Sequence, residues 1–329
     1  MELSNEVVSM STLSKLDSRT VHVAVIVPTY TADRLETLRR CLNGVLDNTR
    51  QPDEIVVVVD SNLPLFELLE RELRDSSVGV VMSEGRGVSA ARNTGARKCE
   101  SEILIFIDDD VFPDRDWLRT MTSTLCRDSV AGAGGNILPD YVKGARELPS
   151  EILWLVGCTY HGHPEGHVPI TRPIGSTMAF RRDAFVTVGG FDSRFGPSGA
   201  RRTSSNEELV LSANIRKRFG QDVIQYQPES IVYHRVPIAR TTLRFLVQRS
   251  WVEGTSKADV RSTYLSDVLH HDQRYLFGTM FPSIVRYLFS GSQSGMKAAF
   301  QLMVVTCVTA VGFLTHRIRS LLRGGRSQK

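Results

Sequence analysis

The sequence lacks most of the features that mark specialised classes of protein. Its five cysteines are odd in number and lie far apart, with no C-x-x-C pair, which argues against a zinc ribbon or a disulfide framework and favours reduced thiols. No apolar run near the start of the chain could serve as a signal peptide. The formal net charge is only +4, which is too small to indicate a nucleic-acid partner.

The remaining composition is typical of a globular protein. Apolar residues make up 41% of the 329 residues and charged residues 23%, which excludes a disordered or fibrous chain. At roughly 150 residues per domain, this length predicts about two domains, or one large α/β domain with an appendage.

Short apolar runs alternate with segments of helical periodicity in the first third of the chain. Buried strands are predicted at 23–29, 55–59, 78–82 and 103–107, with helices at 33–48, 65–74 and 88–99. This order predicts an α/β fold whose parallel sheet has helices on both faces. Further along, 131–170 is rich in Gly, Pro and His and predicts loops, 175–181, 223–227 and 231–235 predict strand pieces, and 206–219 predicts a helix.

Polar side chains follow three of the four predicted strands. Thr29 and Tyr30 end the first, Asp60 follows the second, and Asp108–Asp110 follow the fourth. Ligands of open parallel sheets bind at these carboxyl ends. Three adjacent carboxylates repel one another, and a bound Mg²⁺ or Mn²⁺ would remove that repulsion and neutralise a leaving diphosphate. A solvated acidic turn is the structural alternative.

A second motif points to a different function. G-R-G-V-S-A at 85–90 fits the G-x-G-x-x-A dinucleotide fingerprint, with the acid Asp108 about twenty residues further on. An NAD(P)-dependent oxidoreductase that uses the Gly85–Gly87 loop is therefore an alternative. The motif follows the third strand rather than the first, however, and three carboxylates would repel a pyrophosphate without a metal. We favour a structural role for the glycines, with Arg92 as a phosphate or ribose contact.

Seven segments, taken in order, resemble the family 2 glycosyltransferases, which have the GT-A fold. They are AVIVPTY (24–30), VVVVD (56–60), GVSAARN (87–93), FIDDDVFPD (106–114), GSTMAFRRDAF (175–185), GGFD (189–192) and NEELVLSANIRKRFG (206–220). The resemblance covers residues 22–236. It implies transfer of a sugar from a nucleoside diphosphate with inversion, helped by a divalent metal, Mg²⁺ or Mn²⁺.

The resemblance also implies which residues bind the donor and the metal. The donor-binding set is Pro28, Thr29 and Tyr30 around the nucleoside, Asp60 at the base, Arg92 near the nucleotide, Asp108 near the ribose, Asp109 in an open role, and Gly175 and Ser176 near the phosphates. Asp110 would be the principal metal ligand, with Asp108 and His234 as the further ligands.

An inverting transfer also needs a general base that takes the proton of the acceptor. The family places this base in an acidic pair at the start of a helix, which here is Glu207–Glu208. Glu208 matches the usual base, and Glu207 is the second choice. Independently of the family, the helix dipole stabilises carboxylates at such a position, where Asn206 could cap the helix. A plain helix-start motif is the structural alternative.

The C-terminal part of the sequence differs in character. Residues 298–315 carry no charge, would reach about 27 Å as a helix, and precede a basic tail. They predict a spanning helix, a helix lying on the membrane or a buried helix, and the basic flank favours the membrane interpretations. Before them, 239–252 predicts a basic amphipathic helix with Leu243, Leu246, Val247 and Trp251 on its apolar face.

These observations predict a domain organisation and a function. We expect a flexible N-terminus at 1–20, a GT-A domain at 21–236 with a nucleotide-binding half (21–115) and an acceptor half (116–236), and a helical membrane-associating extension at 237–329. The expected function is inverting transfer from a UDP-sugar to a polyprenyl-linked or envelope glycan acceptor. The enzyme would work at the cytoplasmic face of the cell membrane, peripherally or anchored by one segment. A non-catalytic nucleotide-sugar binding module is a further alternative.

Overall fold

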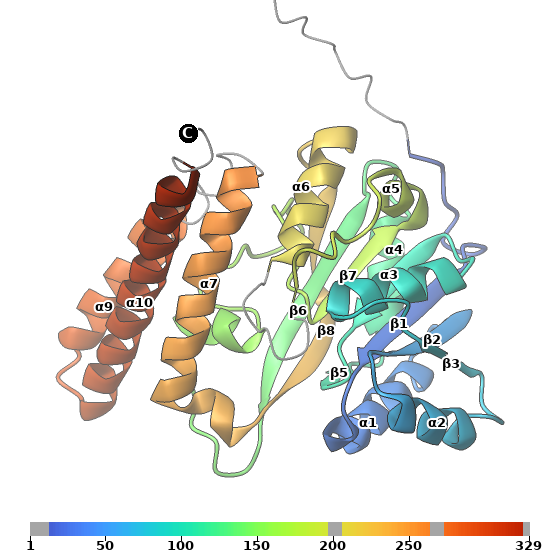
Figure 1. Ribbon diagram of the computed structural model, residues 1–329, viewed down its shortest axis with the longest axis horizontal. Coiled ribbons are helices and arrows are strands. Elements are labelled where there is room, and N and C mark those ends of the chain that lie inside the picture. The colour runs from blue at the N-terminus through green and yellow to red at the C-terminus, as the bar shows by residue number, and fades with distance from the viewer. Residues whose placement is uncertain (1–12, 197–205, 264–272, 325–329) are drawn as a thin grey trace, which may run out of the picture.

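A mixed β-sheet with helices on both faces forms the main body of the molecule, and a layer of helices stands at one end of it (Figure 1). The computed structural model describes residues 13–196, 206–263 and 273–324. Within these residues the sheet has eight strands in the order β3-β2-β1-β4-β7-β6-β8-β5. Most of the N-terminus that the sequence predicts to be flexible, residues 1–12, lies outside the described residues.

The first third of the chain builds the parallel part of the sheet. Its elements are β1 (Val23–Thr29), η1 (Ala32–Arg34), α1 (Leu35–Leu46), β2 (Glu54–Val59), α2 (Leu63–Glu72), β3 (Val78–Met82), α3 (Val88–Lys98) and β4 (Ile103–Ile107). β1 pairs in parallel with β2 and β4, and β2 pairs in parallel with β3. Every side chain of β1 and β4 is buried because helices cover both faces. The predicted strands of this part are confirmed, and their polar carboxyl ends meet at one edge of the sheet.

The middle of the chain extends the sheet with pairings of both directions. Its elements are β5 (Val111–Pro113), α4 (Trp117–Leu125), β6 (Gly132–Tyr141), η2 (Ser150–Val156), β7 (Thr177–Arg181), α5 (Arg182–Thr187), α6 (Glu207–Phe219) and β8 (Ile224–Val236). β7 lies antiparallel to β4 and β6, β8 is parallel to β6, and β5 is antiparallel to β8. The sheet is therefore parallel in its first half and mixed in its second.

Two predictions for the middle of the chain are only partly correct. The segment 131–170 contains the ten-residue strand β6, and the two predicted strand pieces between 223 and 235 are one continuous strand, β8. The glycines of β6 hide the strand pattern because they are typical of loops in a sequence. A Cβ atom on Gly132 would lie 2.8 Å from the ring of Phe180, and one on Gly135 would lie 2.4 Å from the backbone of β8. The strand therefore needs glycine where its neighbours press against it.

Within the described residues, helices α7, α9 and α10 form the layer beside the sheet (Figure 1). The elements are η3 (Ile238–Thr241), α7 (Leu243–Thr263), the π-helical turn η4 (Leu276–Met280), α9 (Phe281–Leu288) and α10 (Gln293–Gly324). α10 packs against both α7 and α9. A Cβ atom on Gly254 of α7 would lie 2.2 Å from the carbonyl oxygen of Thr309 in α10, so the two backbones are in direct contact. Small residues allow the same close approach between membrane helices.

The predicted amphipathic helix at 239–252 is longer, and only part of its predicted apolar face is buried. It begins with η3, continues as the 21 residues of α7, and buries Leu246 of that face together with Glu253. The rest of the predicted apolar face is open, with Leu243 46% and Trp251 38% exposed. Trp251 does not join the core because it lines the cavity that lies between this layer and the sheet.

The predicted apolar segment 298–315 lies inside α10. Among the described residues, Gln293–Arg319 is the one helix that is long and apolar enough to cross a membrane, with a mean hydropathy of 1.9 over eighteen residues. Only 28% of that stretch is buried. The prediction of an apolar C-terminal helix is confirmed, and this helix keeps most of its apolar surface outside the core.

Candidate active site

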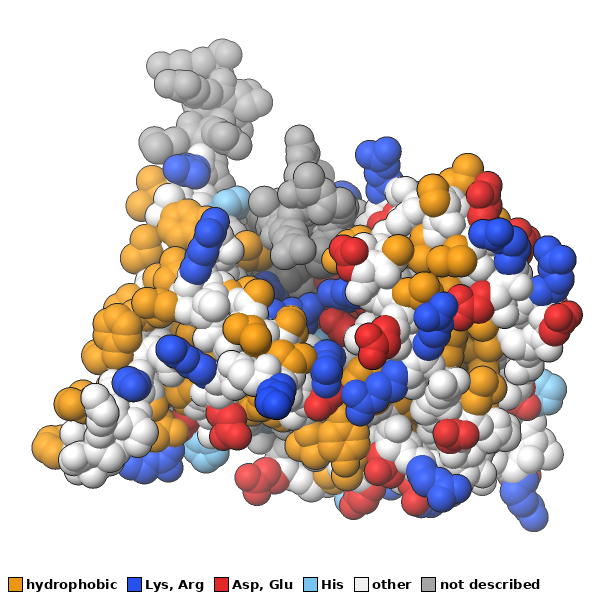
Figure 2. Space-filling model, turned by 90° about the horizontal axis from the view of Figure 1, so that it is seen from below, with side chains coloured by type: hydrophobic (Ala, Val, Ile, Leu, Met, Phe, Trp, Pro, Cys, Tyr) orange, Lys and Arg blue, Asp and Glu red, His pale blue; other side chains and the backbone are white. Residues whose placement is uncertain are grey.

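One cavity of about 1580 Å³ is lined by all of the predicted site residues. It lies at the carboxyl ends of β1, β2 and β4, and α7 and α10 form its opposite wall. The predicted residues that line it are Pro28, Thr29, Tyr30, Asp60, Arg92, Asp108, Asp109, Asp110, Gly175, Ser176, Glu207, Glu208 and His234. Figure 2 shows charged side chains of both signs gathered between the C-terminal helices and the rest of the molecule.

The acidic triplet after β4 does not direct its carboxylates to one point. Asp108 accepts a hydrogen bond from Arg92 at 2.9 Å, whereas Asp109 accepts from Thr29 at 2.7 Å and from Arg34 at 2.6 Å. Burial raises the pKa of Asp109 to about 6, although Arg34 opposes this effect. Asp108 and Asp109 therefore pair with different cations, and Arg34 also lies 3.3 Å from Asp110, which relieves the repulsion predicted from the sequence.

Asp110, the third acid, faces the end of β8. The antiparallel pairing of β5 with β8 sets Val111 opposite His234, which brings Nε2 of His234 to 3.2 Å from Oδ1 of Asp110. Arg240 lies 3.3 Å from the other oxygen. Burial opposes the charge on both members of the pair, but their attraction prevails. It raises the pKa of His234 to about 10 and, together with Arg240, holds the pKa of Asp110 well below its usual value.

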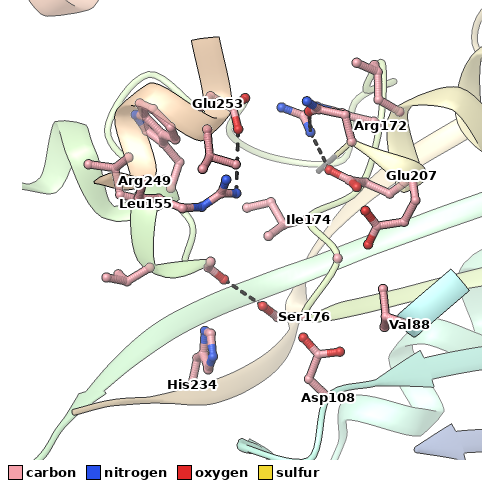
Figure 3. Close-up of a pocket in the computed structure, with 18 of the residues that line it drawn as sticks. Val88, Asp108, Leu155, Arg172, Ile174, Ser176, Glu207, His234, Arg249 and Glu253 are labelled. Carbon is pink, nitrogen blue, oxygen red and sulfur yellow. Dashed lines mark hydrogen bonds and ion pairs between the residues drawn. The ribbon is translucent and has the colours of Figure 1, made fainter. Parts of the chain in front are cut away.

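Gly157 allows His234 and Ser176 to lie close to the backbone. Its φ is +74°, and a Cβ atom there would lie 2.8 Å from Oγ of Ser176 and 3.0 Å from the ring of His234. Ser176 donates a hydrogen bond to the carbonyl oxygen of Gly157 at 3.0 Å, at the centre of the site in Figure 3. Gly157 thereby fixes two predicted residues at once.

Helix α6 begins with the acidic pair on the far side of the cavity from His234 (Figure 3). Glu207 accepts a hydrogen bond at 2.8 Å from Arg92, the same guanidinium that holds Asp108. Glu208 forms an ion pair with Arg172. Burial and the charge of Glu207 raise the pKa of Glu208 to about 7, against the effect of Arg172. Glu208 therefore changes protonation near neutral pH.

Asn206 does not cap helix α6 as the sequence suggested. Its backbone is left-handed, with φ 79°, and its side chain makes no capping hydrogen bond. Instead its Oδ1 accepts a hydrogen bond at 3.1 Å from Arg172. The amide therefore orients the guanidinium that pairs with Glu208. Arg92 is oriented in a similar way, because it donates a hydrogen bond at 3.0 Å to the carbonyl oxygen of Gly175.

The loops after β1 and β2 form the other end of the cavity. Asp60 accepts a hydrogen bond at 2.9 Å from the backbone N–H of Gly87, whose φ of 94° suits glycine. The Gly85–Gly87 loop is thus tied to the strand end by Asp60 and leads into α3. Tyr30 is 47% exposed, with Arg34 stacked over its ring at 5.3 Å.

Comparisons with known proteins identify the family. The model of glycosyl transferase family 2 matches residues 24–189. The chain is 33% identical over 261 residues to a glucosyl-dolichyl phosphate glucuronosyltransferase of Haloferax volcanii. The aligned region covers 75% of this chain and 83% of that protein. The chain belongs to glycosyl transferase family 2. It is also 26% identical to the O-antigen biosynthesis protein RfbC of Myxococcus xanthus, over 71% of this chain but only 19% of that protein.

Solved structures confirm the GT-A fold of this family 2 glycosyltransferase. The mannosyltransferase PcManGT of Pyrobaculum calidifontis, in complex with GDP-Man and Mn²⁺, superposes with a TM-score of 0.61 and 16% identity over 93% of this chain and 90% of that chain. GalNAc-T7 with UDP, GalNAc and Mn²⁺ superposes with a TM-score of 0.52 and 17% identity over 80% and 57%. The oxidoreductase and the non-catalytic module are therefore set aside, and the Gly85–Gly87 loop keeps its structural role.

The family 2 glycosyltransferase offers a divalent metal two converging ligands. The carboxylate of Asp110 and the imidazole of His234 are in contact, whereas Asp108, the third predicted ligand, turns to Arg92. Within the described parts of the chain, no group of three or more His, Cys, Asp or Glu side chains could hold a metal ion. Mg²⁺ commonly binds through one or two carboxylates and takes its other ligands from phosphates and water. The residues therefore fit a metal held jointly with a diphosphate.

Three residues of the site were missed by the sequence analysis. Arg34 pairs with Asp109, Arg172 pairs with Glu208, and Gly157 leaves the space that the ring of His234 occupies. None of them belongs to a motif that the sequence analysis used. Arg34 ends η1, the short helix that directly follows the strand end singled out in the sequence, and this position was the one signal that could have found it.

Proposed function

We propose that this enzyme transfers a sugar, with inversion, from a nucleoside-diphosphate sugar to a sugar on a lipid carrier at a membrane surface. One observation carries the proposal. A single cavity holds a group of acids with a histidine at one end and, across from it, a buried carboxylate with a pKa of about 7. An inverting transfer needs these two functions on opposite sides of the reacting carbon.

The donor is proposed to bind along the carboxyl ends of the parallel strands. Tyr30 and Asp60 would contact the nucleoside, with Pro28 and Thr29 behind it, and Arg92 would set the position of Asp108 at the ribose. Asp110 and His234 would hold Mg²⁺ or Mn²⁺, which when bound would neutralise the leaving diphosphate. The two solved neighbours that contain nucleotides together with Mn²⁺ support this part of the proposal. We propose UDP as the nucleotide.

Glu208 is proposed as the general base. As the acceptor oxygen forms its bond to the sugar carbon, the carboxylate of Glu208 takes the hydroxyl proton, and the bond to the diphosphate breaks with its electron pair on phosphate oxygen. A base with a pKa near the working pH is best suited to this role. Both carboxylates pair with an arginine, but Glu207 is less suited because its partner Arg92 is buried and also holds Asp108 at the proposed donor site.

The lipid-linked acceptor is supported by the relative that acts on glucosyl-dolichyl phosphate and by the exposed apolar side chains of α9 and α10. Phe289 is 86% exposed and Phe300 52%, beside basic residues such as Lys297. Such a surface suits the boundary between lipid head groups and acyl chains. We place the enzyme at the cytoplasmic face of the cell membrane.

The test is a transfer assay with the purified full chain, Mn²⁺ and a panel of UDP-, GDP- and dTDP-sugars. The acceptor is a glucosyl phosphate on a short prenyl chain. We expect one donor to give a product whose new linkage has the opposite anomeric configuration, seen by NMR. A product with retained configuration, or no sugar transfer from any donor in the panel, would overturn the proposal.

A further inference from the structure

The cavity continues well beyond the residues that the chemistry requires. Its volume of about 1580 Å³ exceeds the roughly 300–1,000 Å³ of a pocket for one small molecule. From Glu208 it extends between α7 and α10, where it is lined by Arg249, Lys257 and a row of apolar side chains. The donor proposed above occupies the opposite end, so this region is available to a second ligand.

The part of this region nearest Glu208 carries two cationic side chains, Arg249 and Lys257. Arg249 and Lys257 each lie 3.6 Å from one carboxylate, that of Glu253, which is buried between them on α7. Two cationic side chains therefore flank one carboxylate on this wall, and both cations line the cavity. Figure 3 shows Arg249 and Glu253 on the wall of the cavity that faces Asp108.

A second observation points to a polar ligand at the same place. The indole N–H of Trp154, also in the lining, is buried and has no hydrogen-bond partner among the described residues. Lys257 lies 5.9 Å from the centre of its ring. A buried donor without a partner is costly, and an anion at the cations would give it an acceptor.

The part further from Glu208 is apolar and open. Val247 and Trp251 of α7 face Ala310, Phe313 and Leu314 of α10 across the seam between the two helices. Trp251 is 38% exposed and Leu314 56% exposed, although both line the cavity, so they lie at its mouth. The mouth therefore opens beside the exposed apolar side chains of α10.

We propose that this region binds the carrier lipid of the acceptor, with its phosphate at Arg249 and Lys257 and its hydrocarbon chain leaving between Trp251 and Leu314. The inference rests on the proposed function and names the part of the acceptor that the protein recognises. The ligand class is an isoprenyl monophosphate or phosphodiester. The sugar beyond the phosphate then lies toward Glu208.

The test measures binding by calorimetry, using the full chain in a fixed concentration of non-ionic detergent. The probes are farnesyl phosphate, farnesol and inorganic phosphate. We expect farnesyl phosphate to bind at least about tenfold more tightly than either fragment. The double variant Arg249→Gln/Lys257→Gln should weaken its binding by about 10- to 100-fold, because each lost charged contact is worth roughly tenfold. The matched control Arg244→Gln/Lys98→Gln removes the same charge from exposed positions outside the cavity and should leave it unchanged.

Two further measurements separate the possible failures. Binding of UDP with Mn²⁺ should be the same in both double variants, which shows that the fold and the donor site survive. Ala310→Trp should fill the apolar exit and weaken farnesyl phosphate but not inorganic phosphate. Equal binding of inorganic and farnesyl phosphate, or an undiminished affinity in Arg249→Gln/Lys257→Gln, overturns the lipid site. Loss of sugar transfer with intact farnesyl phosphate binding would instead overturn the proposed function alone.

Discussion

Replacing Glu208 by glutamine should inactivate the enzyme and stabilise its fold. Folding moves the pKa of Glu208 from an ordinary 4.5 to about 7, because burial and Glu207 disfavour the charged form. A pKa raised by folding gives stability that is fully present below 4.5 and is lost as the pH rises through about 7. At about 1.4 kcal/mol per pH unit, the loss at pH 8 is about 3 kcal/mol. Glutamine has the shape of the protonated acid and escapes this loss.

The assay compares the thermal unfolding of the native chain and of Glu208→Gln at pH 5 and pH 8. The variant should melt several degrees higher at pH 8 and nearly equally at pH 5. Its kcat should fall by about 10²- to 10⁴-fold, with UDP and Mn²⁺ binding unchanged. Glu70→Gln, at an exposed position of α2, is the control and should alter neither property. A variant that is less stable at pH 8, or that keeps kcat within tenfold of the native value, would refute the assignment of Glu208.

Three further predictions follow from the contacts of the site and of the helical layer. Arg172→Gln removes the cation that favours ionised Glu208, so the pKa of this base should rise by about 1–3. The acidic limb of the pH profile of kcat/KM should then move to higher pH. The control Arg172→Lys keeps the charge and should retain most of the native profile. Asp110→Asn should abolish the Mn²⁺ dependence of UDP binding in a thermal-shift titration, whereas Asp140→Asn, outside the cavity, should not. Gly312→Leu should lower the free energy of unfolding by about 1–3 kcal/mol in chemical denaturation, because a Cβ atom at this position would already lie 2.9 Å from the carbonyl oxygen of Trp251. Gly278→Ala is the control, since a Cβ atom at that position meets nothing within 4 Å.

The sequence predicts the parts of the molecule whose signals are local. The strands β1, β2 and β4 are buried on both faces, so each reads as an unbroken apolar run that ends at a polar group. Parallel pairing then gathers those polar ends at one edge without further information. For this reason the sequence is sufficient to assign Thr29, Asp60 and Asp108 to one site.

The remaining features depend on contacts between distant parts of the chain. Arg172 meets Glu208 only because the segment before β7 passes the start of α6, and a lone arginine in a loop gives no sign of such a partner. The same holds for β6, whose glycines are required by the close approach of Phe180 and of the β8 backbone rather than by any local conformational preference. Charge patterns are also insufficient by themselves, since the acidic triplet is relieved by cations from three other elements.

Helix α7 connects acceptor selection to membrane attachment in the proposed arrangement. It lines the cavity with Arg249 and Trp251, and it makes backbone contact with α10 through Gly254. A lipid-linked sugar cannot leave the bilayer freely, so its sugar reaches Glu208 only if the cavity opens where the protein meets the lipid. The close crossing of α7 and α10 fixes that opening beside the apolar surface of α10. The soluble donor binds at the opposite end, at the strand ends, so the two substrates need not compete for one entrance.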